Sequence, residues 1–310
     1  MSYDLHALRR AEFPWADRGD AIYLNHASTG PLPACAAAAV GEWAARRTQP
    51  WRIADDALFA TLARTRALVA ALIGAEPGEI ACMPNTSYGL NLAARALPLG
   101  PGDVVVTFDG EFPANVYPWM ALADRGVRLE LVPLGPDGLP DEPALLAALE
   151  RPEVRACTVS WVQFATGYAC DLAAIGARCR ALGKWFVVDA IQGLGPRTLD
   201  VRACHADLLA CGAQKWLLGP WGSGFLYVRR ELVQQLRPTA VGWLAVRGAD
   251  SFARLTDYDP TLRDDARRFE VLTLPFHDFA GMNASLELIH ALGPAGVAAH
   301  VATLADQVVA

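Results

Sequence analysis

The chain has 310 residues, of which 53% are hydrophobic and 19% charged, and its formal net charge at neutral pH is −6. This length exceeds the roughly 250 residues of a typical single core, so it predicts one large domain with an appendage, or two domains. The acidic balance and the scattered arginines argue against a nucleic-acid partner or an anionic membrane surface, because both favour a basic face.

The composition also restricts the cellular setting. No apolar run reaches the roughly 18 residues that span a bilayer, and the first twenty residues lack the apolar stretch of a signal peptide. The seven cysteines are odd in number, have no C-x-x-C spacing and lie mostly in apolar segments. They predict buried thiols in a reducing, cytoplasmic protein, and neither a disulfide scaffold nor a metal site.

Helices and short β-rich runs alternate along the chain. Two helices are expected first, at residues 33–48 and 54–74. The predicted strands are residues 80–83, 104–108, 128–132, 156–161, 185–189, 208–211 and 224–228. The predicted helices between them are residues 87–96, 114–124, 142–150 and 172–182. Several strands are continuous apolar runs, which is typical of strands buried on both faces of a parallel sheet, so the pattern predicts an α/β fold.

Local signals support some of these boundaries. Asp171 is a suitable N-cap for the helix at 172–182, and Gly183 is suited to follow its last turn. Residues 238–268 read as an irregular surface excursion, and two further helices are expected at 280–292 and 294–310. The chain ends inside a helical pattern without a capping residue, which suggests either a frayed last helix or a missing continuation.

Parallel α/β sheets bind ligands at the carboxyl ends of their strands, so residues that follow strands are the first candidates. Asn85, Thr86 and Ser87 follow the first strand and open a helix, an arrangement that suits a phosphate. The same residue types are also common as simple helix caps. Phe112 follows the second strand, where an aromatic side chain is either part of the core or a plate for a cofactor ring.

Asp189 closes an apolar strand, where a carboxylate is costly unless a cation or a hydrogen-bond donor meets it. It is either functional or a cap for a neighbouring helix. Gln192, three residues later, is a candidate donor to the same ligand or a cap of the turn.

The chain contains only two lysines, Lys184 and Lys215. Lys215 lies between an apolar strand and a glycine-rich turn, where desolvation lowers the pKa of an amine as a Schiff-base lysine requires. An isolated lysine is more often a solvated surface group. Lys184 follows a helix C-terminus and is interpreted as structural. The glycines after Lys215 do not form a dinucleotide-binding fingerprint.

A phosphate site, an aromatic plate, a strand-end aspartate and a desolvated lysine are the parts that hold pyridoxal phosphate, PLP. The order of the motifs along the chain is informative as well. They are YLNHASTGPLP, NTSYGLN, EFPANVYPW, WFVVDAIQG, AQKWLLGPWGSGFLYV and LPFHDFAGMNASLEL. Over residues 20–295 the chain resembles the class V aminotransferase family. That family includes cysteine desulfurases and isopenicillin N epimerase-like enzymes, and the resemblance is greatest to the epimerase-like branch.

The resemblance implies a role for each matching residue around the cofactor. Lys215 is implied as the Schiff-base lysine and Asp189 as the partner of the pyridine nitrogen. Gln192 is implied to bond the 3′-oxygen, and Thr86 and Ser87 to hold the phosphate.

Further residues match at the margins of the site. Phe112 stands where desulfurases have a ring-stacking histidine. Asn25 and His26 belong to a stretch that approaches the substrate. Thr273 matches a threonine that reaches the phosphate of the other subunit, which implies a homodimer with shared sites.

The sequence departs from the family pattern in three places. Gln214 replaces a histidine that many members have before the lysine, and still offers a donor to phosphate. Gly212 or Ala213 replaces a common serine, and Phe164 occupies the place of an asparagine beside the 3′-oxygen. The family also continues into a small C-terminal domain, which usually supplies an arginine for the substrate carboxylate and, in desulfurases, the cysteine nucleophile.

The resemblance therefore implies the aspartate-aminotransferase-like fold, PLP fold type I, with the strand at 224–228 antiparallel. The expected domains are an N-terminal segment at 1–30, a PLP-binding α/β domain at 31–280, and helices at 281–310 that lead to an absent small domain.

The expected function is PLP chemistry on an amino acid or amine through a Lys215 aldimine, of the aminotransferase type or of the epimerase or lyase type. Desulfurase activity is disfavoured, because its cysteine belongs to the absent region. The alternatives are a catalytically impaired PLP-binding homologue and a nucleotide-dependent Rossmann enzyme, which the missing glycine fingerprint opposes.

Overall fold

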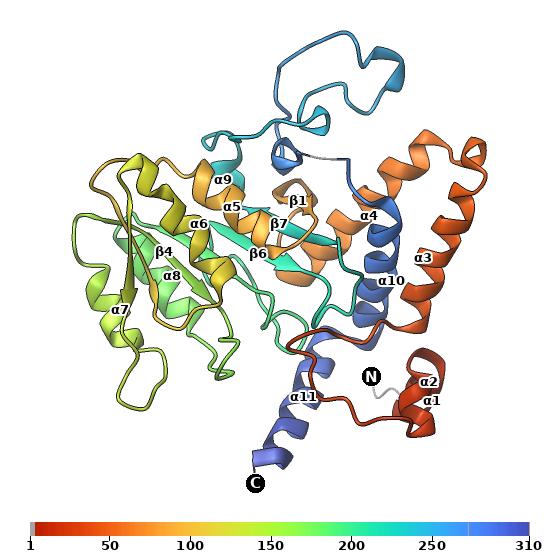
Figure 1. Ribbon diagram of the computed structural model, residues 1–310, viewed down its shortest axis with the longest axis horizontal. Helices are drawn as coiled ribbons and strands as arrows, with labels where there is room; N and C mark the ends of the chain where they lie inside the picture. Colours follow the sequence, from red (N-terminus) through yellow and green to blue (C-terminus); the bar gives the residue numbers. More distant parts are fainter. Residues whose placement is uncertain (1–3, 272, 310) are drawn as a thin grey trace.

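Seven strands form a single mixed sheet in the order β1-β7-β6-β5-β4-β2-β3 (Figure 1). The computed structural model describes residues 4–271 and 273–309. The strands are β1 (Ile80–Met83), β2 (Val104–Phe108), β3 (Arg128–Val132), β4 (Val154–Ser160), β5 (Trp185–Asp189), β6 (Leu208–Gly212) and β7 (Gly224–Val228). Five neighbours, β6, β5, β4, β2 and β3, are parallel, whereas β7 is antiparallel to both β6 and β1. The expected mainly parallel sheet with one reversed strand is confirmed.

Helices connect and flank the strands. The α-helices are α1 (Leu5–Glu12), α2 (Pro14–Arg18), α3 (Ala34–Arg47), α4 (Asp55–Ile73), α5 (Thr86–Ala96), α6 (Tyr117–Met120), α7 (Glu142–Ala148), α8 (Leu172–Ala181), α9 (Arg230–Val233), α10 (Phe276–Leu292) and α11 (Pro294–Val309). Short 3₁₀ helices lie at Pro50–Arg52, Pro77–Glu79, Pro113–Asn115, Ala121–Arg125, Trp243–Ala245, Phe252–Arg254 and Ala266–Phe269.

The two faces of the sheet carry separate hydrophobic cores. Helices α4, α7, α8 and α10 contribute buried side chains to one core, and α5, α6 and α9 to the other. Strand residues alternate between them: Val104 and Val106 belong to the first core and Val105 to the second. Because both faces are covered, the central strands are apolar throughout, which explains why the sequence shows continuous runs rather than alternation.

Some boundaries differ from the sequence-based expectation. Strand β4 covers Val154–Ser160 rather than 156–161. The helix expected at 114–124 is broken into a 3₁₀ turn, α6 and a second 3₁₀ turn. Pro118 lies inside the expected helix and favours this break, because proline lacks the N–H that a continuous helix requires. The local signals at α8 are confirmed: Asp171 accepts a hydrogen bond from the Ala174 N–H at 3.0 Å, and Gly183 has a φ of +64°.

The ends of the chain lie outside the sheet. Helices α1 and α2, which the apolar pattern does not predict, bury no side chain. Glu12 nevertheless accepts a hydrogen bond from the Cys35 N–H at the start of α3, at 2.9 Å. Residues 238–268 form the expected irregular excursion, interrupted only by short 3₁₀ helices; much of it is seen at the top of Figure 1. Within the described residues no single helix is long and apolar enough to cross a membrane; α10 and α11 together would be, but the chain bends by 81° between them.

Candidate active site

Asp189 and Lys215 come from neighbouring parallel strands. Strand β5 ends at Asp189 and β6 ends at Gly212, and Asp189 pairs with Ala210 in the register between them. The chain after β6 therefore starts at the same edge of the sheet as Asp189, and Lys215 follows three residues later. The charges of the two side chains influence each other's pKa. The structure thus brings together the carboxylate and the amine that the sequence singled out.

Asp189 is a buried carboxyl group with 2% of its surface exposed. Burial raises its pKa to about 7, and the nearby charge of Glu111 acts in the same direction. A hydrogen bond from the Ile191 N–H at 3.0 Å and the charge of Lys215 oppose this rise. Among the described residues Ile191 is the one hydrogen-bond donor to Asp189. The second carboxyl oxygen is therefore free to accept a bond from a ligand.

Lys215 is half-buried, and burial lowers the pKa of its amine, against the charges of Asp189 and Cys211. Its Nζ lies 5.5 Å from the centroid of the Phe112 ring. Phe112 meets Phe164 edge to face, with the ring centroids 5.1 Å apart. Both rings keep more than 40% of their surface exposed. The amine therefore faces an open aromatic surface rather than a packed core, and such a surface suits a planar ring.

A strained turn carries the lysine. Leu218 adopts a φ of +55°, a conformation that costs a side-chain-bearing residue energy and that clusters at functional sites. Its N–H donates to the Lys215 carbonyl at 3.2 Å, and its own carbonyl accepts a bond from the Ser285 hydroxyl on α10 at 2.7 Å. On the other side, Gly30 approaches so closely that a Cβ there would lie 1.9 Å from the Lys215 carbonyl oxygen. The turn is held from both sides.

The first turn of α5 lies against the end of β6. Asn85 caps the helix by accepting a bond from the Tyr88 N–H at 2.9 Å, and Thr86 Oγ1 accepts a bond from the Gly212 N–H at 2.8 Å. Ser87, the second residue of the helix, is exposed. The amide oxygen position of Gln214 is buried without a hydrogen-bond partner among the described residues. A helix N-terminus beside an unpartnered amide is an arrangement that a phosphate satisfies.

Gly212 is necessary for this arrangement. A Cβ at this position would lie 2.4 Å from Gln214 Oε1 and 3.3 Å from Thr86 Oγ1. The two polar side chains therefore converge on the same point, which only a glycine leaves open. Because amide oxygen and nitrogen are interchangeable by rotation of the side chain, Gln214 is able to present its NH₂ group to an anion there.

The N-terminal segment forms one wall of the site. The Gln192 side chain donates to the Ala27 carbonyl at 2.9 Å and accepts a bond from Trp216 Nε1 at 2.8 Å. His26 stacks on Trp216, and the Asn25 carbonyl accepts a bond from the Tyr23 hydroxyl at 3.0 Å. Gln192 thus anchors this wall and retains one amide hydrogen, so its expected bond to a 3′-oxygen would use that hydrogen.

Trp216 and Gly30 were not identified from the sequence, because their partners lie far away along the chain.

Glu111 is a further site residue that the sequence analysis missed. It is buried, and burial raises its pKa against hydrogen bonds that favour the charged form. It accepts bonds from the Ser160 N–H at 2.7 Å, the Ser160 hydroxyl, Gln163 Nε2 at 2.8 Å and Asn115 Nδ2 at 3.3 Å. Glu111 thereby joins the loop of Phe112 to the loop of Phe164. A carboxylate soon after an apolar strand was the available signal, the same one that identified Asp189.

Two of the candidate residues form no described hydrogen bond with this group. Thr273 is exposed and accepts a hydrogen bond at 3.1 Å from Nε1 of Trp243, which belongs to the 238–268 excursion. Lys184 donates to the Arg151 carbonyl at 3.1 Å at the opposite end of β5, in agreement with its structural interpretation.

The cysteines are all free: six are buried, as expected, and Cys35 is half-buried. Burial raises the pKa of the Cys35 thiol to about 11.

The fold and this site define a PLP-dependent enzyme of fold type I. The family model of the class V aminotransferases matches residues 22–310, so the chain belongs to that family. The chain is similar to a probable cysteine desulfurase of Methanothermobacter thermautotrophicus, with 31% identity over 88% of this chain and 68% of the relative. Alignments with the curated relatives cover between 53% and 69% of those proteins' own lengths.

Solved structures share the fold. The apo cysteine desulfurase of Thermococcus onnurineus NA1 superimposes with a TM-score of 0.83 and 25% identity, covering 95% of this chain and 73% of that one. The cystine C–S lyase C-DES, in complex with its product cysteine persulfide, matches with a TM-score of 0.79 and 27% identity over 87% of this chain and 72% of that one. A lysine-to-alanine variant of C-DES carries glycine covalently linked to PLP. The family, the fold type and its cofactor are those expected from the sequence.

The residues present fit this cofactor. Thr86, Gln214 and the first turn of α5 offer donors to a phosphate. Unless a phosphate is bound, the buried amide oxygen position of Gln214 has no hydrogen-bond partner among the described residues. Phe112 offers a flat ring beside Lys215, and Asp189 offers a buried carboxyl oxygen to a ring nitrogen. Lys215 is the amine available for covalent attachment at this edge of the sheet.

Proposed function

We propose that this protein binds PLP through Lys215 and uses the same amine to move the α-proton of an amino acid substrate. The observation that carries the proposal is the convergence of the half-buried Lys215 amine, the buried Asp189 carboxyl and the open Phe112 ring at one edge of the sheet. Bound PLP supplies an electron sink for negative charge at the substrate α-carbon.

Each side chain then has a defined task. Lys215 accepts a proton more readily at neutral pH than a solvated lysine does, because burial lowers the pKa of its amine and so increases the fraction that is neutral. Asp189 holds the ring nitrogen of the cofactor through a buried oxygen that no described residue occupies. Glu111 fixes the loops of Phe112 and Phe164, and the wall formed by His26 and Trp216 covers the side of the lysine turn.

The substrate belongs, in this proposal, to the amino acids that the relatives process. The similar proteins include desulfurases and a lyase that acts on cystine. The fate of the proton and of the β-substituent separates the reactions. Protonation of the substrate α-carbon by a second donor, on the face opposite Lys215, gives epimerisation; return of the proton by Lys215 to the cofactor gives transamination, and loss of a β-substituent gives elimination.

We also propose a cytoplasmic homodimer in which Thr273 reaches the phosphate site of the partner. The exposure of Thr273, whose described hydrogen bond is with Trp243 and not with the Lys215 turn, supports this arrangement. Sedimentation at several concentrations tests it. A Thr273→Ala variant that binds PLP as tightly as the native dimer would contradict the shared site.

The central test uses the two lysines as a matched pair. Borohydride treatment of the PLP-saturated protein is expected to attach the cofactor to the peptide that contains Lys215. Lys215→Ala should abolish the adduct and slow α-hydrogen exchange by about 10²- to 10⁴-fold, whereas Lys184→Ala should leave both unchanged. Cysteine, cystine and alanine are then followed by NMR for α-deuteration and for keto acid, sulfide and racemised products. Recovery of the adduct on Lys184, or no uptake of PLP, would refute the proposal.

A further inference from the structure

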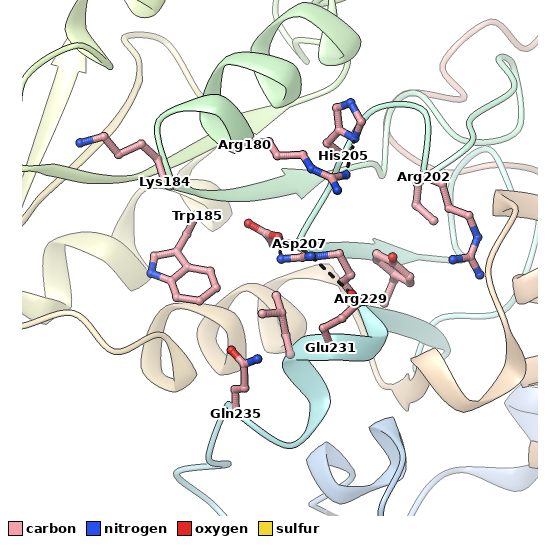
Figure 2. Close-up of a pocket in the computed structure, with 13 residues that line it drawn as sticks. Arg180, Lys184, Trp185, Arg202, His205, Asp207, Arg229, Glu231 and Gln235 are labelled. Carbon is pink, nitrogen blue, oxygen red and sulfur yellow. Dashed lines mark hydrogen bonds and ion pairs between the residues drawn. The ribbon is translucent and has the colours of Figure 1, made fainter.

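A cavity lies at the edge of the sheet opposite Lys215. It has a volume of about 430 Å³ and is bounded by the end of α8, the start of β5, the loop before β6, the end of β7 and α9 (Figure 2). Its basic lining side chains are Arg180, Lys184, Arg202, His205 and Arg229, and its acidic ones are Asp207 and Glu231. The volume falls within the range of small-molecule sites.

Most of these charges already have partners. Arg229 bonds Asp207 at 2.9 Å and approaches Glu231 at 3.4 Å, and Arg202 approaches Glu79 at 3.3 Å. The Lys184 amine turns away from the centre of the cavity in Figure 2. These residues form the walls of the cavity and leave little free charge for a ligand.

Arg180 differs from the other lining cations. Its described hydrogen bond is with His205 Nδ1, at 3.2 Å; no carboxylate or carbonyl of the described residues bonds it, although its charge acts to lower the pKa of nearby Asp207. Because a guanidinium has no acceptor, His205 Nδ1 must accept this bond, and the ring proton must then lie on Nε2. His205 is held in this position with a φ of +54°, which is unusual for a residue with a side chain. Arg180 and His205 therefore both retain free donors.

Tyr227 supplies a third donor. It is only 1% exposed and lines the cavity, yet its hydroxyl forms no hydrogen bond with the residues that the structure describes. The hydroxyl is not among the buried side-chain atoms that lack a partner, so solvent in the cavity reaches it, and a ligand there can accept its hydrogen bond. Burial raises the pKa of Tyr227, so the group remains a protonated donor at neutral pH.

We propose that this cavity binds the phosphate group of a small organic phosphate. Three donors without protein acceptors, from Arg180, His205 and Tyr227, suit the several oxygens of a phosphate better than the two of a carboxylate. The remaining volume has an apolar wall at Trp185 and Leu232, which accommodates the organic part of the ligand. This site is separate from the proposed cofactor site at the other edge of the sheet.

The test titrates the PLP-saturated, borohydride-reduced protein with inorganic phosphate at constant ionic strength. Histidine ring signals are followed by NMR, and His205→Gln assigns the relevant one. The His205 signal should shift saturably with a Kd of about 1 mM, while that of His26 stays unchanged, because His26 reports on the other edge. If the protein takes up no PLP, the same two signals still distinguish the two sites.

Variants decide the assignment. Arg180→Ala should weaken phosphate binding at least tenfold, and Tyr227→Phe about threefold, with no loss of folding stability in the latter because its hydroxyl has no protein partner. Arg95→Ala, an exposed arginine that pairs with Asp124 elsewhere on the surface, serves as the control and should bind as the native protein does. An unshifted His205 signal, or native affinity in both Arg180→Ala and Tyr227→Phe, overturns the proposal.

Discussion

The imidazole of His26 stacks on the indole of Trp216, with ring centroids 5.3 Å apart and an interplanar angle of 18°. Trp216 directly follows Lys215, so a segment near the N-terminus covers the turn that carries the lysine. The hydrogen bond from Gln192 to the Ala27 carbonyl fixes the same segment. Docking of residues 25–30 is thus part of the construction of the site, and this gives the first two predictions.

The docked segment should loosen in acid. Burial lowers the pKa of His26, so the docked state favours the neutral ring. The stabilisation is complete above the ordinary histidine pKa of about 6.5 and is lost as the pH falls through the lower pKa of the docked ring. Limited proteolysis should therefore cleave near residues 19–30 faster at pH 5.5 than at pH 7.5, relative to an unfolded reference substrate. His26→Phe, which keeps an aromatic ring but does not titrate, should remove this difference; equal pH dependence in that variant would contradict the mechanism.

Gly30→Ala should destabilise the protein and impair PLP uptake. The added Cβ would lie 1.9 Å from the Lys215 carbonyl oxygen, and relief of such a clash costs about 1–3 kcal/mol. Gly41→Ala is the matched control, because Gly41 lies within α3 with nothing within 4 Å of the added Cβ. That change should stabilise the protein by about 0.5–1 kcal/mol. Urea unfolding measures both, and a neutral Gly30→Ala would show that the turn accommodates the methyl group freely.

Asp189→Asn should stabilise the cofactor-free protein at alkaline pH while it impairs α-proton exchange. The pKa of Asp189 is raised to about 7 in the folded state from 3.8. The unfolded chain therefore releases this proton at lower pH than the native state does, and the native protein loses stability between about pH 4 and pH 7. The asparagine variant avoids this loss, so its advantage should reach about 2–4 kcal/mol at pH 8 and vanish below pH 4.

Urea unfolding of the cofactor-free protein at pH 4, 6 and 8 measures the effect. The amide oxygen of the substituted side chain can still accept the bond from the Ile191 N–H, so the comparison isolates the charge. A pH-independent difference between the two proteins would show that Asp189 is charged throughout this range.

Glu111 should act on Asp189 as well as on the loops. Its charge helps to raise the pKa of Asp189, so Glu111→Gln should shift the pH-dependent loss of stability to lower pH. Glu111→Ala should in addition cost about 2–4 kcal/mol, because it leaves the buried donors of Ser160 and Gln163 without an acceptor. Glu130→Gln, at a partly exposed glutamate paired with Arg151, is the control and should change stability by less than about 1 kcal/mol. An unchanged pH profile in Glu111→Gln would exclude coupling to Asp189.

The strands were predictable because burial on both faces leaves a continuous apolar run. Strands β1, β2, β3, β5 and β7 have the predicted bounds. Asp189 and Lys215 were predictable for a related reason, since a charged group next to such a run is unusual and calls for a role. The scarcity of lysine then left few candidates for an amine. Signals of this kind can be recognised from the sequence alone, because they depend only on residues that are close together along the chain.

Contacts between distant segments were not predictable in this way. The bonds of Glu111 with Ser160 and Gln163, the stacking of His26 on Trp216 and the approach of Gly30 to the Lys215 carbonyl all join separate parts of the chain. By itself the sequence determined the strand–helix alternation and the residues with unusual chemistry. Only the tertiary structure decided which of them meet, because strand order and loop docking depend on packing across the whole sheet and not on any local pattern.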